Sequence, residues 1–187
     1  MNIKKLLKKA LKDLTEEIGE EPLSDGMIKE YLPDIDIIKY NDLSKYNSIE
    51  EVLPHNKSYK IILVEEKPNS GHWVCLLRYN DIIEYFDSYG NDVDYYIDIL
   101  ENSPNNYKYM SNLFDNTEKK VIYSKYKFQD VGSDINTCGR HIIYRIIQNR
   151  DGDLDLKNYI KNMKEYKKKN SGFSYDDIVS FQVNKTE

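Results

Sequence analysis

Residues 1–19 repeat apolar side chains at the spacing of an amphipathic helix. Apolar positions recur three and four residues apart with lysines between them, and Gly19 is a suitable stop. Because lysines interrupt every apolar stretch, the segment does not have the pattern of a secretory signal, and we expect a protein that is not secreted. We favour a helix docked on the domain with a solvated basic face. A role of its lysines at a membrane surface or on DNA is the alternative.

The middle of the chain changes to strand-like patterns. Apolar runs occur at 60–64, 72–79 and 82–86, and a further short strand is expected at 121–123. The dipeptide Asn80-Asp81 between the second and third runs is typical of a hairpin turn. Such a hairpin would bring the start of one strand beside the end of the next.

Helical patterns account for most of the remaining chain. A short helix capped by Ser24 or Asp25 should run through Tyr31, and further helices are expected at 92–100, 139–148, 154–169 and 175–181. Together the elements predict an α+β fold, a small mixed β-sheet flanked by helices. We expect a single domain over 1–187, with C-terminal helices over 154–181.

Composition and charge narrow the classes of function. The 187 residues carry 27 Lys+Arg against 32 Asp+Glu, a net charge of -5, which argues against a dedicated nucleic-acid binder. No apolar run is long enough to cross a membrane, so a membrane span is excluded, and we expect no membrane partner. The two cysteines exclude a disulfide scaffold and a Cys-rich zinc module, and we expect no metal. A single alanine beside 17 tyrosines indicates an AT-rich gene.

Cys138 is the first candidate for chemistry. It directly precedes the helix expected at 139–148, where unpaired backbone N–H groups and the helix dipole favour a thiolate. A small buried cysteine without chemistry is the commoner alternative. We expect Cys75, within the strand at 72–79, to be of that inert kind.

A nucleophilic thiol needs a base, and the chain has three histidines. His72 begins a strand, which offers an accessible and rigid platform. The expected hairpin brings it close to Asp87, whose carboxylate could orient the imidazole. His141 follows Cys138 by three residues and could touch it, but the helix carries it away from the helix N-terminus. His55 lies in an expected loop without an evident orienting partner.

Gln129 offers a side-chain amide upstream of Cys138. An amide N–H and the backbone N–H of Cys138 could together stabilise the oxyanion of a tetrahedral intermediate. A solvated polar residue is the alternative for a single glutamine in a loop.

Four segments in this order resemble the adenain-like and SUMO-protease-like cysteine peptidases: Gly71-His72-Trp73, Phe86-Asp87-Ser88-Tyr89-Gly90, Phe128-Gln129 and Thr137-Cys138-Gly139-Arg140. The resemblance covers a catalytic centre over residues 60–150 and implies a papain-like/adenain-like fold. It implies His72 as general base, Asp87 as its orienter, Cys138 as nucleophile, Gln129 in the oxyanion hole and Trp73 at the substrate cleft. The interval between Gln129 and Cys138 is longer than in the cellular members.

The Thr-Cys-Gly-Arg run and the AT-rich composition look most like the maturation proteases of virophages, Polinton-like elements and giant viruses. This resemblance implies an endopeptidase that cleaves capsid precursor proteins, located in the virion and the host cytoplasm. We expect a monomer without an obligatory cofactor, while DNA or an activating peptide as cofactor and weak DNA binding stay open.

Three alternatives to capsid processing remain at this point. The same fold and catalytic set serve proteases of ubiquitin or ubiquitin-like modifiers, and acetyltransferase activity is known on this fold as well. The third alternative is a non-catalytic virion or interaction protein whose triad-like residues are incidental.

Overall fold

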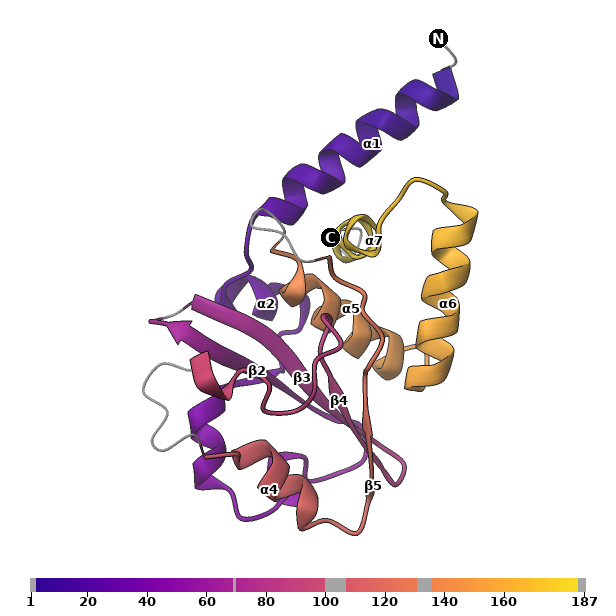
Figure 1. Cartoon of the computed structure of the whole chain (residues 1–187). Coiled ribbons are helices and arrows are strands. Elements are labelled where there is room, and N and C mark those ends of the chain that lie inside the picture. Colours follow the sequence, from indigo (N-terminus) through magenta and orange to yellow (C-terminus); the bar gives the residue numbers. More distant parts are fainter. Residues whose placement is uncertain (1–2, 69, 100–106, 131–135, 185–187) are drawn as a thin grey trace. The chain divides into compact units, whose positions relative to one another are not determined.

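The structure is a computed structural model, and it describes residues 3–68, 70–99, 107–130 and 136–184 (Figure 1). The chain folds into two compact units. The first, here called the sheet unit, is the continuous segment 34–127, and the second, the helical unit, combines 1–33 with 128–187. That the two units act as one peptidase domain stays a prediction.

The sheet unit is built on a five-stranded mixed sheet. In sheet order the strands are β1 (Asp36–Lys39), β2 (Ser58–Lys67), β3 (Ser70–Tyr79), β4 (Ile82–Phe86) and β5 (Lys120–Tyr123). The inner strands β2, β3 and β4 are antiparallel, and β1 and β5 run parallel to their neighbours. All four expected strands are present. β1 was not expected, because its two apolar residues between an aspartate and a lysine are too few to form a pattern.

β3 and β4 form the expected hairpin around Asn80-Asp81, seen in Figure 1. Asn80 has a φ of 53°, a left-handed conformation that asparagine tolerates better than most residues. The register pairs Tyr79 with Ile82 and continues to Cys75 opposite Phe86. The residue after β4 therefore lies near the beginning of β3.

Short helices complete the sheet unit: η1 (Tyr40–Lys45), α3 (Ile49–Val52), η2 (Ile97–Ile99) and α4 (Tyr109–Asp115). Their apolar side chains share one core with β2, β3 and β4. The helix expected at 92–100 is wrong, since residues 93–96 form turns and only η2 is helical within 92–99. Asp94 has a φ of 60°, and its carboxylate binds the Tyr40 hydroxyl and the Ser111 backbone N–H, so tertiary contacts bend the chain here.

The helical unit contains five helices in the part of it that the structure describes: α1 (Ile3–Glu20), α2 (Asp25–Tyr31), α5 (Cys138–Arg150), α6 (Leu156–Lys169) and α7 (Tyr175–Asn184). α7 contacts both α1 and α5, and most of α5 is buried, as its sequence predicts. Ser24 caps α2 by accepting the N–H of Met27 at 3.3 Å. The α+β fold class is confirmed. Within the described ranges, no helix is long and apolar enough to cross a membrane.

Candidate active-site residues in the two units

His72 and Asp87 form a buried pair in the sheet unit. His72 lies near the start of β3 and Asp87 directly follows β4, so the hairpin register brings them together. Nε2 of His72 is 2.8 Å from Oδ1 of Asp87, and the side chains are 5% and 0% exposed. Because a carboxylate only accepts, Nε2 carries a proton and Nδ1 is the nitrogen suited to proton exchange. The expected pairing is present, and its catalytic role stays a prediction.

Two further donors fix the Asp87 carboxylate. Oδ1 also accepts the backbone N–H of Tyr89 at 2.9 Å, and Oδ2 accepts the hydroxyl of Tyr96 at 2.9 Å. Burial, followed by the nearby charge of Asp87, raises the pKa of Tyr96 far above its ordinary value, so its hydroxyl stays a donor. Asn91 in turn donates to the Tyr96 oxygen at 2.7 Å. The orientation of Asp87 is therefore set by a chain of hydrogen bonds.

Aromatic rings hold the plane of the His72 imidazole. The Tyr89 ring stacks on it at 4.8 Å with an interplanar angle of 28°, and the Tyr96 ring lies at 5.0 Å with an angle of 43°. Sequence reasoning missed Tyr96, because its position depends on the turn at 93–96, for which a helix was expected. Tyr89 belongs to the Phe-Asp-Ser-Tyr-Gly segment, and that segment was the available signal.

Gly71 allows the chain to enter β3 just before His72. The pairing of β2 and β3 shifts register at this point, between Glu65 and Lys67. A Cβ on Gly71 would lie 2.0 Å from the carbonyl oxygen of Val64, a distance that no side chain can accept. A glycine is therefore required where the strand delivers His72.

The other two β3 residues that the sequence singled out are buried. Cys75 is 0% exposed, which confirms it as a core residue. Trp73 is 5% exposed and pairs with Leu63 of β2. Its role at a substrate cleft stays a prediction.

Cys138 begins α5 in the helical unit, as expected, and the residue is partly exposed. Thr137 occupies the N-cap position, but its side chain makes no capping hydrogen bond to the helix. Gly139 packs closely against Leu23, which lies just before α2. A Cβ on Gly139 would be 3.0 Å from Cβ of Leu23. The position at a helix N-terminus favours the thiolate form of Cys138.

Backbone carbonyls at the end of α1 hold the chain on both sides of Cys138. Asn136 donates its backbone N–H and its side-chain amide to the carbonyls of residues 19 and 20, at 3.0 and 2.7 Å. Arg140 donates to the carbonyl of residue 21 at 2.7 Å. Three consecutive carbonyls of residues 19–21 are thus tied to the segment that carries the thiol.

Gln129 is fully buried, which rules out the solvated alternative. The backbone N–H of the next residue, Asp130, donates to Oδ2 of Asp176 at 3.2 Å. Residues 131–135 lie outside the described part of the chain. The proposed oxyanion role of Gln129 stays a prediction.

His141 belongs to a second buried histidine–aspartate pair, which the sequence did not reveal. Its Nε2 lies 3.0 Å from Oδ1 of Asp176 on α7, and its side chain is 0% exposed. Nδ1 has no hydrogen-bond partner in the described part of the chain. His55, in contrast, is exposed and its Nδ1 lies 3.1 Å from the Ser58 hydroxyl. No cluster of metal-ligating side chains occurs among the residues described.

A comparison with known sequences gives the family. A protein from Sputnik virophage, called Uncharacterized protein V9, is 35% identical over 140 residues, which cover 71% of this chain and 79% of the virophage protein. The chain belongs to the family of this virophage V9 protein. No model of a known protein family matches it.

The V9-family chain shares its fold with a viral protease. The crystal structure of the ASFV pS273R protease superposes with a TM-score of 0.51 at 13% identity, over 88% of this chain and 67% of that chain. This likeness concerns the fold. The expectations of a protease fold and of a virophage relative are both confirmed, while the assignment to the adenain-like branch stays a prediction.

Proposed function

We propose that this V9-family chain is a cysteine peptidase with Cys138 as nucleophile and His72 as general base. The observation that carries the proposal is the His72–Asp87 pair, which is buried, hydrogen-bonded and packed against the rings of Tyr89 and Tyr96. The chain that holds this pair has the fold of a viral protease. A partly exposed cysteine at the start of α5 supplies the second component. Buried imidazole–carboxylate pairs of this kind orient a base for a nucleophile.

The proposed reaction is acyl transfer through a thioester. The Cys138 thiolate attacks the scissile carbonyl carbon, and the amide of Gln129 and the Cys138 backbone N–H stabilise the resulting oxyanion. The imidazolium of His72 gives its proton from Nδ1 to the leaving amine, and the C–N bond breaks. His72 then takes a proton from water, which attacks the thioester, releases the acid and restores the thiol.

Asp87 would keep one imidazole tautomer throughout this cycle. By accepting from Nε2, its carboxylate keeps that proton in place and directs exchange to Nδ1. His141 is the competing base, since it is closer to Cys138 in sequence. Its complete burial favours a structural role instead.

As substrates we propose capsid precursor proteins encoded by the same genome, cleaved in the virion or the host cytoplasm. The kinship with a Sputnik virophage protein and the fold of a viral protease support a viral role. We propose that the monomer acts without an obligatory DNA or peptide cofactor.

The test is cleavage of these capsid proteins by the full chain, with new termini identified by mass spectrometry. Cys138→Ala should abolish cleavage, and His72→Ala should lower kcat by about a hundredfold or more, the usual contribution of a general base. Cys75→Ala is the matched control, because it removes the other thiol and should change kcat by less than about twofold.

The outcomes separate the proposals. Cleavage that persists in Cys138→Ala would show that this cysteine is not the nucleophile. If ubiquitin-like conjugates are cleaved and capsid proteins are not, the peptidase stands and the substrate is wrong. If a thiol-reactive probe labels Cys138 no faster than Cys75 and nothing is cleaved, the chain is a non-catalytic protein.

A further inference from the structure

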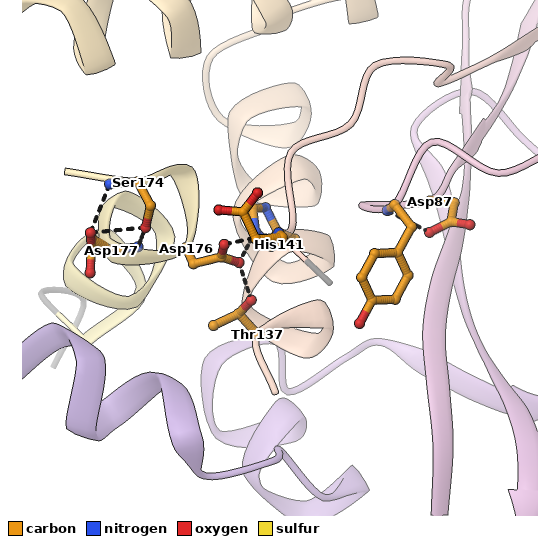
Figure 2. A network of polar contacts seen from close by, with 8 residues as sticks. Asp87, Thr137, His141, Ser174, Asp176 and Asp177 are labelled. Carbon is orange, nitrogen blue, oxygen red and sulfur yellow. Dashed lines mark hydrogen bonds and ion pairs between the residues drawn. The ribbon is translucent and has the colours of Figure 1, made fainter. Parts of the chain in front are cut away.

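One carboxylate in the helical unit accepts hydrogen bonds from residues that precede and follow Cys138 in the chain. Asp176, the second residue of α7, accepts the Thr137 hydroxyl and Nε2 of His141 at Oδ1, and the Asp130 backbone N–H at Oδ2. The distances to His141 and Asp130 are 3.0 and 3.2 Å. Figure 2 shows the bonds from Asp176 to His141 and Thr137. Asp176 is buried.

Two of the three donors are sequence neighbours of residues with proposed chemical roles. Asp130 follows Gln129, and Thr137 precedes Cys138. We propose that Asp176 is a positioning residue that sets the Cys138 thiol and the Gln129 amide relative to each other. This inference rests on the proposed function and adds a residue to it.

The ionised form of Asp176 is well suited to this role. Burial acts to raise its pKa, but the hydrogen bonds from His141, Thr137 and Asp130 outweigh burial and leave the pKa below the ordinary value. A buried carboxylate needs its full set of donors, so it fixes their directions strongly.

Thr137 and the length of the connection support the same role. Thr137 stands at the N-cap of α5 but directs its hydroxyl to α7 instead of capping the helix. The interval from Gln129 to Cys138 is long, and a longer connection constrains its own ends less. A carboxylate that binds both Asp130 and Thr137 supplies the missing constraint.

The neighbouring Asp177 offers a matched control. It is 3% exposed, and it accepts the Thr15 hydroxyl at 3.1 Å and the Ser174 backbone N–H and hydroxyl at 2.7 and 2.8 Å. These bonds tie the start of α7 to α1 and to its own preceding turn, as Figure 2 shows for Ser174. They do not reach the segment next to Cys138.

The experiment compares Asp176→Asn with Asp177→Asn in the full chain carrying Cys75→Ala. Both variants should lower the thermal unfolding midpoint. Only Asp176→Asn should lower kcat, by about tenfold to a hundredfold with KM within about twofold, because it loses bonds to a charged group at the reacting end. Only Asp176→Asn should also change the pH profile of Cys138 alkylation by iodoacetamide.

A second pair of variants covers a failure of Asp176→Asn to fold. Thr137→Val removes the hydroxyl but keeps the shape, and it should reproduce the losses. Thr137→Ser keeps the hydroxyl and should restore kcat to within about threefold of the parent. Equal losses in Asp176→Asn and Asp177→Asn, or in Thr137→Val and Thr137→Ser, would overturn the positioning role.

The alkylation profile needs no substrate. It therefore tests the positioning of Cys138 separately from the peptidase proposal, which fails if Cys138→Ala cleaves like the parent. An alkylation profile that is the same in all four variants would overturn the inference, whatever the cleavage assay gives.

Discussion

At the scale of single residues, the molecule contains two buried histidine–aspartate pairs with different surroundings. His72 is held between tyrosine rings and bound to Asp87, whereas His141 is enclosed at 0% exposure beside Asp176. The first arrangement joins two neighbouring strands of the sheet unit, and the second joins α5 to α7. The type of residue pair is the same, and the surroundings of the two imidazoles differ.

The Tyr96 hydroxyl should matter to His72 through Asp87. In Tyr96→Phe the carboxylate loses its donor at Oδ2, so we expect kcat to fall about threefold to tenfold with little change in KM. Nitrogen chemical shifts of the His72 ring should show a smaller share of the tautomer protonated at Nε2. Tyr79→Phe is the control, since that buried hydroxyl binds Glu84 at 2.6 Å, and an equal loss there would contradict the argument.

The candidate residues were predictable from sequence to the extent that local geometry brings them together. The hairpin register alone placed Asp87 beside His72, and the helix pattern placed Cys138 at an N-terminus. Tyr96 and Asp176 were not predictable, because a turn stabilised by distant contacts positions the first and the packing of α7 on α5 positions the second.

At the scale of elements, a close approach of two backbones at the start of β3 determines the position of the candidate residue His72. Gly71→Ala should destabilise the protein by about 2 kcal/mol or more, because its Cβ would collide with the Val64 carbonyl and force the strands apart. Urea unfolding measures the loss. Gly26→Ala in α2 is the opposite case, since its Cβ meets nothing closer than 3.8 Å, and it should stabilise by about 0.5–1 kcal/mol. Equal effects would show that the close approach is unimportant.

The Asp176 carboxylate at the beginning of α7 should make the free energy of unfolding depend on pH in the acidic range. The folded pKa of Asp176 lies below the ordinary value of 3.8, so its contribution is present above that pH and is lost as the pH falls through the folded pKa. We expect Asp176→Asn to lower the free energy of unfolding at pH 7, by about 1–3 kcal/mol for a buried group that loses partners. The difference from wild type should shrink below about pH 4. A difference that is independent of pH would contradict this account.

At the scale of the whole molecule, composition narrowed the classes of function. Apolar runs predicted strands of the sheet, because a buried strand needs several consecutive apolar residues. The short elements β1 and α4 were missed, since β1 has only two apolar residues and α4 lacks an N-cap side chain like the Ser24 that marks α2. The expected helix at 92–100 failed because contacts of Asp94 with Tyr40 and Ser111 outweigh local preference. Local pattern predicts an element only where long-range contacts agree with it.

The net charge of -5 leads to a prediction about cofactors. We expect the cleavage rate to change by less than about twofold when double-stranded DNA is added, and to depend little on salt between about 50 and 200 mM. Rates are to be compared with and without nuclease treatment. Stimulation by DNA that disappears at high salt would show that the lysines of α1 and α6 bind it.

The division of the chain also sets an order of assembly during synthesis. The sheet unit is one continuous segment, so it can fold as soon as residue 127 has left the ribosome. The helical unit draws on both ends of the chain, and the bond between Thr15 and Asp177 spans nearly its full length. The His72–Asp87 pair can therefore form early, whereas the contacts beside Cys138 need α7 and form only after residue 176 has been synthesised. If His72 and Cys138 have the proposed roles, a nascent chain would carry an oriented base before the contacts around the nucleophile have formed.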